Sequence, residues 1–172
     1  HFLQPDTVNK FYYDRSNGIV VMKSDSGDRV VKKEGNIFSK MVATNAAAYI
    51  VKHRPNLCFI HFTDTDTIGH EFGWSSPEQI KAFADTDVAL GIIRKAIQKA
   101  GIARRSVIII SADHGGSGKG HSKGTPEDMT IPWIIWGPGV KKRFTITDPV
   151  STCDTAATAL WLLGVEPIAP LD

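Results

Sequence analysis

The sequence has little of what marks the specialised classes of protein. Its two cysteines, Cys58 and Cys153, are too few for a disulfide-stabilised miniprotein, and whether they are free or bridged stays open. Apolar stretches such as residues 107–110 and 131–136 fall far short of the ~20 residues that a membrane-spanning helix needs. With 20 Lys and Arg against 18 Asp and Glu, the formal net charge of +2 gives no electrostatic case for nucleic acid or an anionic membrane as the main partner.

The N-terminus lacks both an initiator methionine and a signal-peptide pattern. We therefore expect the chain, which starts at His1, to be a processed product or a piece of a longer protein. What is present is the composition of a folded domain, with 42% hydrophobic and 22% charged residues. At 172 residues the chain is long enough to bury a core.

Helical and strand-like segments alternate along most of the chain. The long helix has the clearest limits, because Ser76 and Pro77 form an N-cap and first turn and Gly101 supplies the stop. The expected helices are 36–54, 76–100 and 154–163, and the expected strands are 57–62, 106–111 and 131–136. This order predicts an α/β fold with a largely parallel sheet flanked by helices, in a single domain over residues 1–172.

The first 35 residues differ from the rest in being polar and rich in turns. Here the short β-rich runs 19–22 and 29–31 flank a Gly/Asp turn, which predicts a hairpin. We expect residues 1–35 to form a peripheral β-rich segment.

Acidic and imidazole side chains follow two of the predicted strands. Asp66 and His70 are spaced i, i+4, so a helical turn places them on one face. Asp113 and His114 leave the next strand together, and His121 follows across a glycine-rich loop. Three imidazoles and two carboxylates make a mixed N/O ligand set that suits zinc or a similar divalent ion.

Each of these motifs taken alone also has an ordinary structural interpretation. An Asp-xxx-His pair is more often a contact on a helix surface, and Asp-His-Gly can be only a turn that ends a strand. The glycines of residues 115–120 lack the order of a phosphate-binding P-loop.

Taken together, these motifs indicate a family more strongly than any one of them does alone. The segments that carry a family resemblance are 66–73, 87–91, 111–116, 131–139 and 154–160. Together they resemble the alkaline phosphatase superfamily, most closely its type I phosphodiesterase/nucleotide pyrophosphatase branch, with sulfatases as near relatives. The resemblance covers residues 36–167 in order, and it implies an α/β/α core whose N-terminal part is incomplete here.

The resemblance also implies a catalytic centre with two divalent metal ions, zinc or else manganese. Asp66 and His70 correspond to ligands of one ion, which His121 completes, and Asp113 and His114 correspond to ligands of the other. The reaction implied is hydrolysis of a small phosphate ester, of the phosphodiester or nucleotide pyrophosphate type.

The family's Thr or Ser nucleophile has no counterpart in the sequence. It belongs to a strand-end segment well before Asp66, and neither Asp6-Thr7 nor Asp14-Arg15-Ser16 follows an apolar strand. We therefore expect this chain to be the C-terminal portion of a larger catalytic domain, holding most of the metal ligands but not the nucleophile.

Several alternatives stay open. A sulfatase is the nearest; it would need a Cys or Ser nucleophile in a Cys/Ser-x-Pro-x-Arg setting, and neither Cys58 nor Cys153 has that setting. A metal-dependent phosphoglycerate mutase is a weaker option. A non-catalytic metal-binding domain is the alternative of another class. Trp74 and Lys123 could contact substrate or have only packing and surface roles. The family resemblance implies a periplasmic or extracellular location.

Overall fold

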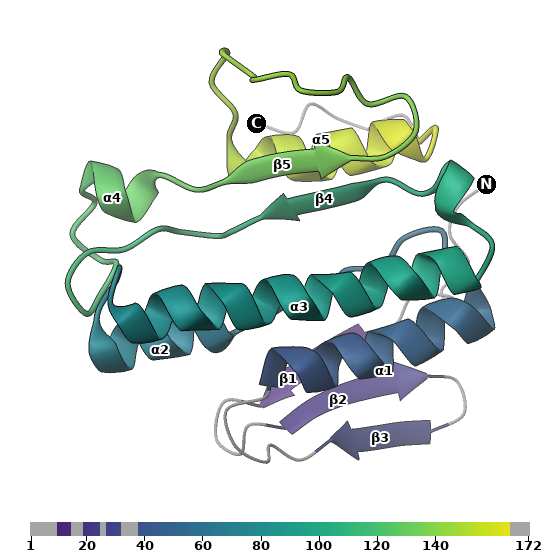
Figure 1. Ribbon diagram of the computed structural model, residues 1–172, viewed down its shortest axis with the longest axis horizontal. Coiled ribbons are helices and arrows are strands. Elements are labelled where there is room, and N and C mark those ends of the chain that lie inside the picture. Colours follow the sequence, from purple (N-terminus) through teal and green to yellow (C-terminus); the bar gives the residue numbers. More distant parts are fainter. Residues whose placement is uncertain (1–9, 15–18, 25–26, 32–37, 166–172) are drawn as a thin grey trace.

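Helix α3 (Pro77–Lys99) is the longest element and lies across the middle of the molecule (Figure 1). The computed structural model describes residues 10–14, 19–24, 27–31 and 38–165. These residues form a mixed α/β structure, as the sequence predicts at this level. None of the helices in those ranges combines the length and the apolar composition of a membrane span.

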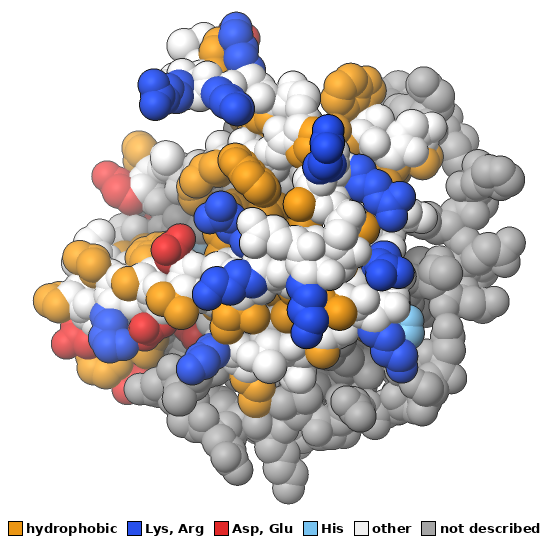
Figure 2. Space-filling model, turned by 45° about the vertical axis from the view of Figure 1, so that its right-hand side comes forward, with side chains coloured by type: hydrophobic (Ala, Val, Ile, Leu, Met, Phe, Trp, Pro, Cys, Tyr) orange, Lys and Arg blue, Asp and Glu red, His pale blue; other side chains and the backbone are white. Residues whose placement is uncertain are grey.

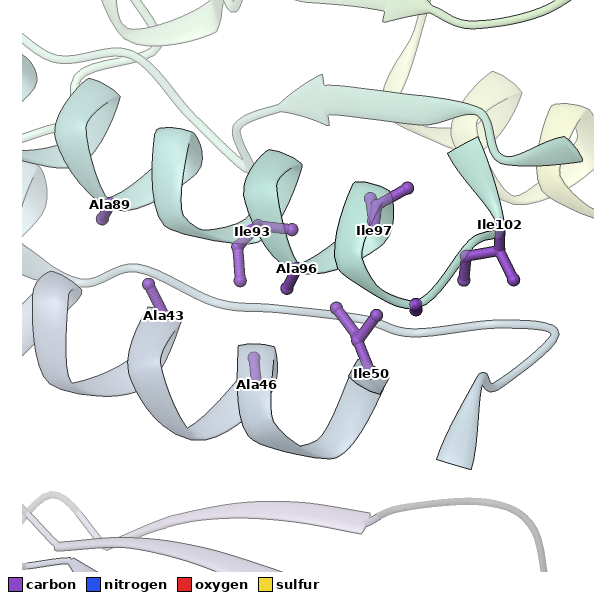
Figure 3. Close-up of a cluster of buried hydrophobic side chains, with 9 residues drawn as sticks. Ala43, Ala46, Ile50, Ala89, Ile93, Ala96, Ile97 and Ile102 are labelled. Atoms are coloured by element: carbon purple, nitrogen blue, oxygen red, sulfur yellow. The ribbon is translucent and has the colours of Figure 1, made fainter. Parts of the chain in front are cut away.

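Helix α1 (Phe38–His53) packs along α3, and the two helices run in the same direction (Figure 1). Small side chains line their contact: Ala43 and Ala46 on α1 face Ala89 and Ala96 on α3, and all four are buried (Figure 3). Alanines let the two backbones approach closely, and isoleucines fill the remaining space. The larger members of this core are Ile50, Ile93, Ile97 and Ile102.

The ends of α3 follow the prediction, but its exposed side is more apolar than expected. The Ser76 hydroxyl accepts a hydrogen bond from the Gln79 N–H, and Gly101 follows the helix with a φ of 72°. Ile80 and Phe83 belong to the apolar pattern of the sequence, yet they are exposed. The core takes the alanine-rich face of the helix instead.

Residues 57–62, predicted to be a buried strand, are extended but belong to no strand of the described structure. Cys58, Ile60 and Phe62 pack against the core between α1 and α3, whereas Leu57 and Phe59 are 53% and 72% exposed. Alternation of this kind is the period of a strand with one covered face. The prediction of a fully buried strand is therefore wrong for the described structure, because this segment has neither a ladder partner nor a second covering layer there.

The two strands of the small central sheet run antiparallel, so the described residues do not show the largely parallel sheet that the sequence predicts. Strand β4 (Ile108–Ser111) pairs with β5 (Trp133–Trp136), with Ile108 opposite Trp136. The reason lies in the connection between them. The N–H groups of Gly115 and Gly116 donate to the carbonyls of Asp128 and Glu127 at 2.7 and 2.9 Å, so the chain returns to the point where β4 ends. Strand β5 then starts beside the end of β4 and runs back along it.

Helix α5 (Thr152–Leu162) contacts β4 and hydrogen-bonds to β5. The Trp133 indole N–H donates to the Thr155 hydroxyl at 2.9 Å. A capping box of Ser151 and Asp154 starts the helix, and Gly164 follows its end with a φ of 68°. The sheet is also tied to α3, because the Arg94 guanidinium lies 5.1 Å from the centre of the Trp136 ring.

A second sheet is formed by β1 (Lys10–Asp14), β2 (Ile19–Ser24) and β3 (Gly27–Val31), all antiparallel. Strands β2 and β3 are the predicted hairpin, and β1 adds a third strand that the sequence pattern did not indicate. In Figure 1 this sheet lies beyond α1, away from α3.

Charged side chains are unevenly distributed along the fold. No acidic residue occurs between Asp87 and Asp113, and the stretch contains five basic residues: Arg94, Lys95, Lys99, Arg104 and Arg105. Figure 2 shows Lys and Arg spread over one face, with Asp and Glu gathered at one side of the view. Outside this basic stretch, several acidic residues lie on α2 and in the segment that follows β4. A cation is expected to bind where these carboxylates gather.

The two cysteines are free, and they differ in environment. Burial raises the pKa of the Cys58 thiol to about 11, whereas Cys153 is exposed. At about pH 8 we expect iodoacetamide to alkylate Cys153 and to spare Cys58 until the protein is unfolded, because only a thiolate attacks the reagent. Peptide mass spectrometry checks this, with Cys153→Ser as the control. Equal labelling of both thiols in the folded chain would contradict it.

Candidate metal centre

The five candidate residues come from helix α2 (Asp64–Phe72) and from the loop after β4. Asp66 and His70 lie one turn apart on α2, as their spacing predicts, and the imidazole Nε2 of His70 is 3.3 Å from Asp66 Oδ1. His114 approaches the same oxygen from the loop, with its Nε2 at 3.7 Å. Ligand atoms of Asp66, His70 and His121 all lie within 4.8 Å of one another.

Asp113 and His121 differ in how far they enter the cluster. The rings of His121 and His114 are stacked, with centroids 3.6 Å apart and an angle of 12° between the planes. The Asp113 side chain is 80% exposed, and Asp113 Oδ2 is 3.7 Å from the Nε2 of its neighbour His114. His70, His114 and His121 are thus gathered around the Asp66 carboxylate, and Asp113 stands at the edge.

Backbone carbonyls set the orientation of two imidazoles. His70 Nδ1 is 3.0 Å from the carbonyl oxygen of Lys119, and His114 Nδ1 is 2.8 Å from that of Gly115. A carbonyl only accepts, so in each ring Nδ1 carries the proton and, in the neutral ring, Nε2 keeps its lone pair. Both Nε2 atoms are then directed at Asp66, in the arrangement typical of histidines that bind a metal.

Asp66 Oδ1 provides the test of whether a cation fits. This atom is shielded from solvent and accepts no hydrogen bond from the described residues. A buried carboxylate oxygen facing two imidazole lone pairs is electrostatically unfavourable unless a positive charge lies between them. The donor set of one carboxylate and several imidazoles fits a divalent metal ion such as zinc.

Helix α2 is held in place by its neighbours on both sides. Asp64 Oδ2 accepts a hydrogen bond from the Ser39 N–H at 2.8 Å, which ties the start of α2 to the start of α1. Gln79 on α3 is buried; its amide donates to the Thr65 carbonyl at 3.0 Å and accepts from the Ser75 N–H at 2.7 Å. The start of the helix that carries Asp66 and His70 is therefore tied to both α1 and α3.

The glycine-rich loop is organised around a buried carboxylate, that of Asp128 on the short helix α4 (Pro126–Met129). Asp128 Oδ1 accepts from the Ser117 hydroxyl at 2.9 Å, and Oδ2 accepts from the Lys123 N–H at 2.8 Å. Burial raises the pKa of Asp128, but hydrogen bonds from Ser117, Lys123 and Thr125 outweigh it and hold that pKa below its usual value. Residues 117–123, which include His121, are therefore anchored at both ends.

Two of these supporting residues, Gln79 and Asp128, were not among the candidates from the sequence. Gln79 lies within a helical pattern and looks like any surface glutamine. Asp128 does have a local signature, because Thr125 and Pro126 place it at the third position of an N-capped helix. Its bonds to Ser117 and Lys123 depend on the folding of the loop, which the pattern does not reveal.

Comparison with known proteins identifies the family. The family model described as type I phosphodiesterase / nucleotide pyrophosphatase matches residues 4–121, more than half of the chain. The chain belongs to this family. The match begins at residue 4, so it includes the β-rich N-terminal segment. The resemblance of individual motifs in the sequence begins only at residue 36.

Individual relatives place the family member within the alkaline phosphatase superfamily. It is 26% identical over 149 residues to GPI ethanolamine phosphate transferase 1 of Saccharomyces cerevisiae, covering 86% of this chain and 16% of the relative. It is 31% identical over 118 residues to arylsulfatase K of Danio rerio, covering 63% of this chain and 21% of the relative. The chain thus spans about a fifth or less of the length of these relatives. Members of the family generally use divalent metals.

Proposed function

We propose that the protein to which this chain belongs is a metal-dependent hydrolase of phosphate esters, of the phosphodiester or nucleotide pyrophosphate type. The chain supplies ligands of the catalytic metal ions. The observation that carries the proposal is the buried Asp66 Oδ1, which lacks a hydrogen-bond donor among the described residues and faces the Nε2 atoms of His70 and His114.

We assign Asp66, His70 and His121 to one ion, and Asp113 and His114 to a second ion that needs a further ligand from elsewhere in the protein. Zinc suits this set, and manganese is the alternative. When bound, two such ions neutralise phosphoryl oxygens and activate an attacking hydroxyl. The Lys119 and Gly115 carbonyls hold His70 and His114 with Nε2 toward the centre.

The remaining parts of the proposal concern the whole protein. We place the Thr or Ser nucleophile before Asp66, in a segment of the larger catalytic domain of which this chain is the C-terminal portion. Residues 57–62 would then pair with strands of that domain in a parallel sheet, consistent with their extended backbone and alternating exposure. A periplasmic or extracellular location stays a prediction.

A sulfatase is the second candidate, and the similarity to arylsulfatase K favours it. Phosphate and sulfate esters present similar tetrahedral anions, so the same ligand set can serve both. The difference lies in the nucleophile. A sulfatase requires a Cys or Ser in a Cys/Ser-x-Pro-x-Arg sequence, and neither Cys58 nor Cys153 of this chain lies in one.

The test compares three substrates with the full-length protein: an aryl phosphodiester, an aryl phosphate monoester and an aryl sulfate. We expect turnover of the phosphodiester, loss of that turnover on treatment with a chelator, and recovery when Zn²⁺ or Mn²⁺ is added back. Preference for the aryl sulfate would establish the sulfatase alternative. Phosphodiester hydrolysis that withstands complete removal of metal would refute the proposal.

A further inference from the structure

We propose that Trp74 positions the imidazoles of the metal centre, acting as one packing platform for His70, His114 and His121. This inference rests on the proposed metal-binding role of these histidines. Trp74 lies in the turn between α2 and α3, just after the end of the helix that carries His70. The sequence alone leaves open whether Trp74 contacts substrate or has only a packing role.

The indole contacts all three rings. Its centre lies 5.0 Å from that of His70, with the ring planes at 88°. The corresponding distances are 5.9 Å to His121 and 6.4 Å to His114. The His70 and His121 pairs are edge-to-face, whereas the His114 pair is tilted at 50°. Edge-to-face packing is favourable for a ring with a negative face, and more so when the imidazole gains positive character on binding a cation.

Two glycines of the metal-binding motifs make room for the indole. A Cβ on Gly69, the residue before His70, would lie 2.6 Å from the Gln79 amide nitrogen and 3.0 Å from an atom of the Trp74 ring, so this glycine makes room for both side chains. A Cβ on Gly116, two residues after His114, would overlap the indole outright, and the three nearest atoms are all from Trp74. Trp74 therefore packs directly against the backbone on both sides of the centre.

The backbone of the turn holds the indole in this place. The Trp74 N–H donates to the Gly118 carbonyl at 2.7 Å, within the loop that leads to His121. The next residue, Ser75, has a φ of 64°, and its N–H donates to the buried Gln79 side chain. Trp74 and Ser75 together thus link the end of α2 to the glycine-rich loop and to the start of α3.

These contacts indicate a positioning residue rather than a ligand. The indole offers one N–H donor and no lone pair that could bind a metal ion. Its effect is to restrict the rotamers of three imidazoles that come from separate segments. Loosening such a support weakens metal binding without removing any ligand atom.

The first test measures metal binding by the full chain with Trp74→Leu, Trp74→Phe and the control Trp161→Leu, whose indole is 77% exposed on α5. For Trp74→Leu we expect zinc affinity to fall about 10- to 100-fold and the visible absorption of bound Co²⁺ to change, as when an outer partner of a metal ligand is lost. Trp74→Phe should recover part of both, and Trp161→Leu should match the wild type. Unchanged affinity and Co²⁺ absorption in Trp74→Leu would overturn the inference while leaving the proposed function intact.

The second test needs no metal. Gly116→Ala should lower the melting temperature strongly in the wild-type background and much less beside Trp74→Ala, because the three atoms nearest to the added Cβ all belong to the indole. NMR of the histidine ring protons should show all three rings shifted in Trp74→Ala. Additive effects of the two substitutions would overturn the inference, whether or not the wild type binds metal. Failure of the wild type to bind zinc or Co²⁺ would instead count against the proposed function.

Discussion

Asp66→Asn is expected to abolish metal binding at the site of Asp66, His70 and His121 and to lower phosphodiester turnover by more than about a hundredfold. Loss of an outer partner of a metal ligand costs up to that factor, and a direct ligand should cost more. The substitution keeps the shape of the side chain but removes the charge that compensates the cation. Metal content by mass spectrometry and turnover by the full-length protein are the measurements.

Asp85→Asn is the matched control for this experiment. Asp85 is an exposed helical carboxylate, and its partner is Lys81 one turn away on α3, at 2.6 Å. Exposed pairs of this kind contribute little, so both metal content and turnover should stay at the wild-type level. If Asp66→Asn also kept a full complement of metal, the assignment of Asp66 as a ligand would be wrong.

Asp128→Asn is expected to disorder the glycine-rich loop and to weaken metal binding about 10- to 100-fold, the range for supports of metal ligands. Each carboxylate oxygen of Asp128 accepts a hydrogen bond from the loop. An amide has only one oxygen, so one of the two donors would face an NH₂ group. Hydrogen exchange across residues 115–124 and zinc titration measure the two effects.

The same residue predicts how stability depends on pH. The pKa of Asp128 is lowered in the folded protein, so its contribution is fully present above the unfolded value of about 3.9 and is lost as pH falls through the folded value. The wild type should therefore lose stability more steeply than Asp128→Asn on acidification below about pH 4. Asp154→Asn is the matched control, because Asp154 is also the third residue of an N-capped helix, but is exposed. Identical acid profiles for wild type and Asp128→Asn would refute the prediction.

Local signals explain which elements could be predicted from the sequence. Ser76 and Pro77 start α3, and glycines follow the ends of α3 and α5, because caps and stops depend only on neighbouring residues. The direction of β5 could not be predicted in this way. It is set by hydrogen bonds between Gly115 and Asp128, which are 13 positions apart and meet only when the loop has folded.

The same difference between local signals and long-range contacts applies to the candidate site. The spacing of Asp66 and His70 places them together on α2, since helical geometry alone suffices. The support given by Trp74 could not be found, because it depends on how the turn after α2 meets a loop more than 40 residues later in the chain. Glycines beside His70 and His114 were the available sign, since each marks a place where a side chain would obstruct a neighbour.

Residues 57–62 have a practical consequence for work with this chain alone. Within the described part of the chain, the amide and carbonyl groups of their extended backbone have no backbone partner, and they lie next to the exposed side chains of Leu57 and Phe59. Such an edge is the template on which a β-strand from another molecule can add. A preparation of the isolated chain should accordingly form oligomers through this edge as its concentration rises. The substitution Phe59→Lys should oppose this oligomerisation, because a charged side chain on an exposed edge disfavours strand addition. The side chain at position 59 faces away from the core, so the packing of Ile60 and Phe62 would stay unchanged.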